Sequence, residues 1–283
     1  MTSQTIETKR TAIITGGSRG VGRNTAINLA RRGVDVIFTY HSNQAEAESV
    51  IREIEEMGGR AAAFRLDTGT LGAFDGFVTD VRKALESWGR ERFDYLVNNA
   101  GNSQHIDFDK VTEADFDAVV NVHFKGVYFL TRKLLPLMND GGRIVNISSG
   151  LTRAAVPGSS AYAAAKGAIE ILTRYLAKEL GPRNGAQPLR DRLADSTLGA
   201  SVIVNYTASE QQAKETVRTI EHLGGTATAV QADVSTVADI DRLLRRPSSD
   251  LAASTSSSQT PGLNASDYRS RMSPSRTSTG PST

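Results

Sequence analysis

The apolar positions up to about residue 181 alternate between short β-branched runs and stretches with helical periodicity. Such alternation is typical of βα units arranged around a parallel sheet. Gly58-Gly59 is a helix stop signal, and Thr112 and Asp115 form a capping box that begins a helix. The pattern predicts strands at residues 11–15, 34–39, 61–65, 93–97 and 143–148, and helices at residues 20–32, 43–57, 74–88, 112–138 and 161–180. We therefore expect an α/β fold with a doubly wound parallel sheet.

Residues 33–67 align without gaps with residues 199–233, and 13 of the 35 aligned positions are identical. The second copy predicts another strand–helix–strand unit, but no glycine-rich turn precedes it. A fragment of about 60 residues without a first strand is too small for an independent core. We expect residues 200–205 and 226–231 to pair in parallel beside the 143–148 strand as substitute strands six and seven, with the helix at residues 208–223 packed on one sheet face.

Residues 247–283 differ in composition from the rest of the chain. Serine occupies 12 of these 37 positions, and threonine and proline add nine more. Such a segment buries too little apolar surface to offset the entropy of ordering it, so we expect a disordered tail.

Composition and charge narrow the functional classes. The 283 residues include 33 Lys and Arg against 31 Asp and Glu, a net charge of +2 that is spread along the chain and argues against nucleic acid as a partner. The absence of cysteine excludes disulfides, thiolate zinc sites and a cysteine nucleophile. Residues 1–10 show no secretory signal peptide, and no run approaches the roughly 20 apolar residues of a membrane helix. We expect a cytoplasmic protein without a membrane partner.

A glycine-rich turn follows the first predicted strand and begins the first helix. Glycines at this position let the backbone approach a pyrophosphate, whose charge is favoured at a helix N-terminus, although a tight turn with no ligand remains the alternative. The candidate residues are Gly16, Ser18, Arg19, Gly20, Val21 and Gly22.

The end of the second predicted strand bears on the choice of cofactor. Tyr40, His41 and Ser42 follow this strand without a carboxylate to accept bonds from a ribose hydroxyl, and Arg19 lies in the turn that faces the same corner. Because arginine can bind a 2′-phosphate, the residues favour NADP(H) over NAD(H), with a solvated arginine as the alternative.

Tyr162 and Lys166 are four residues apart in a predicted helix, on one helix face. A cation beside tyrosine favours the phenolate and lowers its pKa from about 10, which suits proton donation to a carbonyl oxygen. Ser149 lies just after the fifth predicted strand, where its hydroxyl could hold the same oxygen. Alone, a Tyr–Lys pair is also compatible with an ordinary surface.

Taken together and in order, these motifs resemble the short-chain dehydrogenase/reductase family, and most of all its NADPH-dependent reductases of the beta-ketoacyl-carrier-protein reductase and glucose dehydrogenase type. The resemblance implies a Rossmann fold in which Tyr162 is the general acid/base, Lys166 lowers its pKa and holds the nicotinamide ribose, and Ser149 orients the carbonyl. It further implies a water relay at Asn121. The cofactor positions that it adds are Asp67 and Thr68 after strand three and Asn98, Ala100 and Gly101 after strand four. It implies no role for His41 in catalysis, nor any for His105, His123 and His222.

The resemblance to one complete enzyme ends near Pro182-Arg183. Residues 193–245 instead resemble a fragment of a second family member, so that the C-terminal strands are atypical. We therefore divide the chain into a catalytic dinucleotide-binding region at 1–183, a partial repeat at 184–246 and a tail at 247–283. The predicted function is hydride transfer between NADP(H) and a small carbonyl or alcohol substrate, with a dimer or tetramer formed through helices 112–138 and 161–180. The alternative is a fusion or truncated reductase that binds cofactor but turns over poorly, because the substrate loop is missing.

Overall fold

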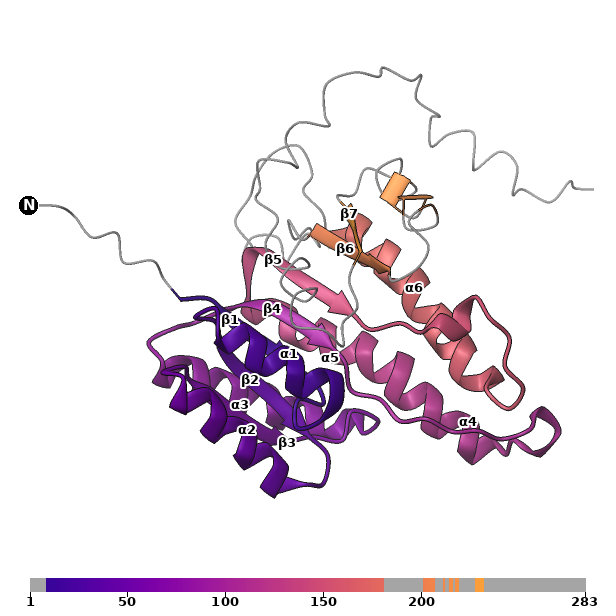
Figure 1. Cartoon of the computed structure of the whole chain (residues 1–283), viewed down its shortest axis with the longest axis horizontal. Helices are drawn as coiled ribbons and strands as arrows, with labels where there is room; N and C mark the ends of the chain where they lie inside the picture. The colour runs from indigo at the N-terminus through magenta and orange to yellow at the C-terminus, as the bar shows by residue number, and fades with distance from the viewer. Residues whose placement is uncertain are drawn as a thin grey trace, which may run out of the picture. The chain divides into compact units, whose positions relative to one another are not determined.

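The computed structural model describes residues 9–180, 201–206, 211, 214–215, 217–218 and 227–231. Within them, seven parallel strands form one sheet in the order β3-β2-β1-β4-β5-β6-β7 (Figure 1). The strands are β1 (Thr11–Ile14), β2 (Asp35–Tyr40), β3 (Ala61–Arg65), β4 (Phe93–Asn98), β5 (Met138–Asn146), β6 (Ser201–Tyr206) and β7 (Ala227–Gln231). This order confirms the doubly wound sheet of the Rossmann fold.

Helices cover both faces of the sheet. Ala12 and Ile14 of β1 pack with α1 and α2, whereas Ile13 points to the opposite face and packs with α3 and α5. This alternation follows from the two-residue period of a strand, and it explains why both sides of β1 are apolar. The helices are α1 (Gly20–Ala30), α2 (Gln44–Glu56), α3 (Phe74–Ser87), α4 (Glu113–Val120), α5 (Gly126–Leu134) and α6 (Ser160–Leu180), with short 3₁₀ turns at η1 (Leu71–Ala73), η2 (Phe108–Lys110), η4 (Leu135–Leu137) and η5 (Gly150–Thr152).

Strands β6 and β7 come from the second copy of the repeat. Arg143 and Ile144 of β5 pair with Ser201 and Val202 of β6, and β6 pairs with β7 along its length. Residues 181–200, most of the expected helix at 208–223, and the tail at 247–283 lie outside the described residues. The division of the chain at residues 183 and 246 therefore stays a prediction.

Two predicted elements differ from the structure. The helix expected at residues 112–138 is divided into α4, the π-helical turn η3 (Asn121–Lys125), α5 and η4. The strand expected at residues 143–148 begins five residues earlier and ends at Asn146. The cause is a bulge: Phe93 pairs with Met138 and Tyr95 with Arg143, so extra residues of β5 are accommodated where Gly141 adopts φ +73°.

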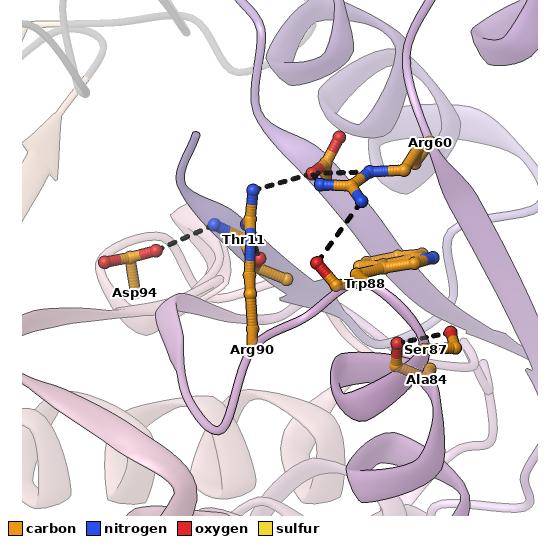
Figure 2. A network of polar contacts seen from close by, with 8 residues as sticks. Thr11, Arg60, Ala84, Ser87, Trp88, Arg90 and Asp94 are labelled. Carbon is orange, nitrogen blue, oxygen red and sulfur yellow. Dashed lines mark hydrogen bonds and ion pairs between the residues drawn. The ribbon is translucent and has the colours of Figure 1, made fainter. Parts of the chain in front are cut away.

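An ion cluster around one buried carboxylate joins the amino ends of the strands (Figure 2). The Asp35 carboxylate, 1% exposed, accepts hydrogen bonds from Arg60 Nε and Nη2 at 3.0 and 2.6 Å and from Arg90 Nη2 at 2.9 Å. Arg90 also donates to the Thr11 hydroxyl, and the Arg60 guanidinium lies 5.4 Å from the centre of the Trp88 ring. Because Asp35 begins β2, this cluster lies at the sheet edge opposite to the strand ends where ligands bind in such folds.

Candidate active site

The glycine-rich turn leaves the carboxyl end of β1 and is held against β2. The Gly16 amide donates to Thr39 Oγ1 at 3.0 Å. Gly20 adopts φ +56°, and a Cβ on Gly22 would lie 2.1 Å from the Gly16 carbonyl oxygen, so both positions require glycine. Arg19, the N-cap of α1, makes no side-chain capping bond. The amides of the first helical turn are therefore available to an anionic ligand.

Thr15 and Asn99 join this turn to the end of β4. The Thr15 hydroxyl accepts bonds from the amides of Asn99 and Ala100 at 3.0 and 2.9 Å. The Asn99 side-chain amide donates to the carbonyls of Thr15 and Gly16 at 2.9 and 3.0 Å. These four hydrogen bonds thus join the carboxyl end of β1 to that of β4. Neither residue was among the candidates named from the sequence.

A cavity of about 720 Å³ opens at the carboxyl ends of β1 to β4. The sequence-predicted residues that line it are Gly16, Ser18, Arg19, Gly20, Val21, His41, Asp67, Thr68, Ala100, Gly101 and Asn121. The lining residues that were not predicted from the sequence include Thr39, Asn99, Asn102 and Val122. The glycine turn, the corner after β2 and the loop after β3 thus meet around one space.

Six predicted cofactor residues do not line this cavity: Tyr162 and Lys166, which are described below, and Gly22, Tyr40, Ser42 and Asn98. Gly22 lies beneath the turn, Tyr40 packs beside the α1–α2 side of the core, and Ser42 is exposed. Asn98 is 4% exposed, and its amide donates to Thr131 Oγ1 at 3.0 Å and Asn146 Oδ1 at 2.8 Å. As the last residue of β4, Asn98 directs its side chain into the core, where it joins β4, β5 and α5.

Tyr162 and Lys166 lie in the first two turns of α6. Lys166 is 5% exposed; its Nζ donates to the Ile147 carbonyl at 2.7 Å and lies 5.8 Å from the centre of the Tyr162 ring. Burial lowers the pKa of Lys166 from 10.5 to about 8. The spacing of four residues therefore places a buried amine beside the phenol.

Ser149 lies three residues after β5, as the N-cap of η5, and its Oγ accepts a bond from the Leu151 amide at 3.2 Å. The residues around it are tied to α6. The hydroxyls of Ser148 and Thr152 both donate to Glu170 Oε1, at 2.7 and 2.9 Å. Glu170, one turn beyond Lys166, thus holds the segment that carries Ser149, a role that the sequence alone did not indicate.

His123, to which the sequence assigned no role, is buried beside Tyr162. It lies in the π-helical turn η3 and is 2% exposed; its ring centre is 4.9 Å from that of Tyr162 at an interplanar angle of 81°. Burial, and then the charge of Lys166, lower the pKa of His123 to about 4, against the opposing effect of its bond to the Asn102 backbone. A neutral imidazole therefore contacts the candidate acid.

In the described part of the chain, no group of three or more His, Asp and Glu residues is placed to hold a metal ion. Among the same residues, no helix combines the length and apolar character that crossing a membrane would need.

Relatives of known structure share this architecture. The promiscuous reductase LugOII, which catalyses keto-reduction at C1 during lugdunomycin biosynthesis, superposes with a TM-score of 0.61 and 32% identity, covering 81% of this chain and 97% of its own. The landomycin C-6 ketoreductase LanV, solved with bound NADP and rabelomycin, gives a TM-score of 0.61 and 30% identity over 82% of this chain and 86% of its own.

Curated sequences match 62% of the chain. A short-chain dehydrogenase/reductase of Pestalotiopsis microspora is 35% identical over 179 residues, which are 62% of this chain and 64% of that protein. The short-chain dehydrogenase/reductase FrzI of Cladobotryum sp is 37% identical over 62% of this chain and 66% of its own length. The chain thus spans just under two thirds of these relatives. A model of the short chain dehydrogenase family matches residues 10–186, and the chain belongs to that family.

Proposed function

We propose that this protein is an NADP(H)-dependent oxidoreductase that reduces a small carbonyl substrate or oxidises the corresponding alcohol. The observation that carries the proposal is the buried Lys166 amine beside Tyr162. His123 connects Tyr162 to Asn102, which lines a cavity that begins at the N-terminus of α1. The names of LugOII and LanV as ketoreductases support this reaction class. They do not favour the alternative of a cofactor-binding protein with little turnover.

The residues around the cavity fit a phosphorylated dinucleotide. The first-turn amides of α1 suit a pyrophosphate, because they are free of side-chain caps. Arg19 and His41 line the cavity at the corner after β2, and residues 41–43 of that corner include no carboxylate. Arg65, which the sequence analysis did not single out, donates its Nε to the His41 carbonyl at 3.2 Å and brings a second guanidinium to this corner. These groups favour a 2′-phosphate over a free ribose hydroxyl.

The chemistry divides between cofactor and protein. The nicotinamide, when bound, supplies a hydride to the carbonyl carbon. Tyr162 donates its hydroxyl proton to the carbonyl oxygen, so that the product is an alcohol, and Ser149 orients that oxygen by a hydrogen bond. The ammonium of Lys166 stabilises the phenolate that remains. Asn121, which lines the cavity, holds the water through which Tyr162 regains a proton.

The test of this reaction is the variant Tyr162→Phe. It removes the proton donor and leaves the ring in place, so turnover of a ketone panel with NADPH should fall at least about 10²-fold while the NADPH dissociation constant changes less than about twofold. Turnover is followed by NADPH absorbance, and affinity by NADPH fluorescence. Turnover by Tyr162→Phe at a rate near that of the unmutated protein would remove Tyr162 from the mechanism.

Cofactor preference is tested with Arg19→Ala. Loss of a charge-assisted bond to the phosphate should weaken NADPH binding about tenfold and leave NADH binding nearly unchanged. Arg153→Ala, on the loop before α6 and not among the residues that line the cavity, is the matched control. Equal affinity of the unmutated protein for both cofactors would contradict the assignment.

We further infer that copies of the chain associate through the two helices predicted at residues 112–138 and 161–180. Large apolar side chains are exposed on the elements that these ranges form: Phe116 on α4, Tyr128 on α5, and Ile171 and Tyr175 on α6. Removing these side chains from water would favour association.

A further inference from the structure

We propose that His123 is a positioning residue that holds the Tyr162 ring and the Asn102 loop in one arrangement, as a neutral imidazole protonated on Nε2. The inference rests on the proposed function, in which Tyr162 is the proton donor. It adds a second residue of the π-helical turn η3, besides Asn121, to a set whose other members come from α6 and the turn after β5.

Two side chains contact the Tyr162 ring. The Lys166 Nζ lies 5.8 Å from the ring centre, and it donates a hydrogen bond to the Ile147 carbonyl. The His123 ring forms an edge-to-face pair with Tyr162, at 4.9 Å and 81°. Such pairs stabilise the packing beyond simple burial, which favours one ring position over a tilted one. The structure thus fixes the phenol by packing as well as by its helix.

The hydrogen bonds of His123 determine its tautomer. Nε2 lies 2.7 Å from the Asn102 carbonyl oxygen and 2.9 Å from Asn102 Oδ1. Because a carbonyl oxygen only accepts, Nε2 carries the proton; the 3.3 Å contact from the Asn102 amide is the weaker of the two backbone contacts. Nδ1 is buried and has no protein partner within the described residues. A second proton on Nδ1 would be buried near Lys166, so the imidazole stays neutral.

Through these bonds His123 also acts on the cavity. Asn102 lines the cavity, and so do Asn121 and Val122, the first two residues of the same π-helical turn. Next to them, a Cβ on Gly101 would lie 2.7 Å from the His123 ring, so the loop after β4 fits closely over the imidazole. Turns of this type occur often at functional sites. His123 therefore connects the loop after β4, which lines the cavity, with Tyr162, the proposed proton donor.

Two substitutions separate the two contacts. His123→Phe keeps a ring against Tyr162 but loses the bond to Asn102, so the NADPH dissociation constant should rise about fivefold while kcat changes less than about twofold. His123→Gln keeps an N–H donor but loses the ring, so kcat should fall about fivefold while NADPH affinity changes less than about twofold. His105→Phe, at an exposed histidine, is the matched control and should change neither.

Binding is measured by NADPH fluorescence, and kcat with the ketone that the unmutated protein reduces fastest. Nitrogen-15 NMR of the imidazole at pH 7 should show the neutral Nε2–H tautomer. Equal changes in affinity and kcat for both variants, a change in the unfolding midpoint alone, or an Nδ1–H or charged imidazole would each overturn the proposal. The NMR arm decides even where both variants fail to fold, because it uses the unmutated protein.

The design also distinguishes this inference from the proposed function. If the unmutated protein binds NADPH but reduces no ketone, the proposed reaction is wrong. The contact between His123 and the Asn102 loop is still tested by the NADPH affinity of His123→Phe and by the tautomer of His123. The ring contact is then read from the Tyr162 ring proton shifts, assigned with Tyr162→Phe. Loss of the imidazole ring current in His123→Gln should move these signals, and unmoved signals would overturn the ring contact.

Discussion

Gly126 offers a strict test of how the site is held together, because it is the first residue of α5, directly after η3. A Cβ at this position would lie 2.0 Å from the Thr68 carbonyl oxygen and 2.7 Å from that of Asn121. Cβ atoms essentially never come within 3.0 Å of another heavy atom, so Gly126→Ala must separate α5 from the loop after β3 by about 1 Å.

The expected cost follows from two opposing effects. Alanine stabilises a helix by about 0.5–1 kcal/mol relative to glycine. Overpacking costs about 1–3 kcal/mol, and the upper end applies because both clashing oxygens at Gly126 belong to backbone that cannot rotate away. We expect Gly126→Ala to lower the free energy of unfolding by about 2 kcal/mol. NADPH should also bind more weakly, because Thr68 lines the cavity.

The assay is urea unfolding followed by the fluorescence of Trp88, the chain's single tryptophan. Gly76→Ala in α3 is the matched control, since a Cβ there meets nothing within 4 Å. It should raise the free energy of unfolding by about 0.5–1 kcal/mol. If Gly126→Ala unfolds at the same urea concentration as Gly76→Ala, the close contact between α5 and the loop after β3 is refuted.

Three further predictions concern the ion cluster, the buried lysine and self-association. Asp35→Asn should lower the free energy of unfolding, measured in urea, by about 2 kcal/mol. The loss is smaller than for a fully buried ion pair because Arg60 is 41% exposed. The control Asp107→Asn, at a surface ion pair, should change the free energy of unfolding by less than about 0.5 kcal/mol. Because burial lowers the pKa of Lys166 from 10.5 to about 8, the native state loses this proton at a lower pH than the unfolded state does. The free energy of unfolding of the unmutated protein, relative to that of Lys166→Met, should therefore rise by about 1 kcal/mol between pH 7 and 9. No rise would contradict the shift in pKa. Light scattering should show a dimer or larger assembly, which Tyr175→Glu converts to monomer; an unmutated monomer would exclude the interface.

The fold could be predicted from the sequence because most of its elements are local in origin. The buried strands are short β-branched runs, and α2 shows both its N-cap at Asn43 and its stop at Gly58-Gly59. The elements that were wrong depend on long-range contacts. The π-helical turn within the predicted helix is stabilised by packing against Tyr162 and the loop after β3, and the early start of β5 depends on its pairing with Phe93.

The candidate site was predictable only where spacing along the chain fixes spacing in the fold. Tyr162 and Lys166 share a helix face, and the glycine turn is contiguous, so both could be identified from the residues. The hydrogen-bond partner of His123 is 21 residues away along the chain, and those of Glu170 are 22 and 18 residues away. No local pattern marks such residues, because a buried histidine and a helix-surface glutamate have ordinary structural uses.

Comparison of the two copies of the repeat separates the residues that form strands from the residues that form the ion cluster and the cofactor corner. Strands β6 and β7 extend the sheet, and the second copy keeps the apolar strand pattern and the Gly224-Gly225 stop signal. At the aligned positions, however, Asp35 and Arg60 of the ion cluster correspond to Ser201 and Thr226, while His41 and Arg65 of the cofactor corner correspond to Thr207 and Gln231. The second copy therefore retains the residues that form strands and has lost both the charges that lock the first copy and those that suit it to a phosphate.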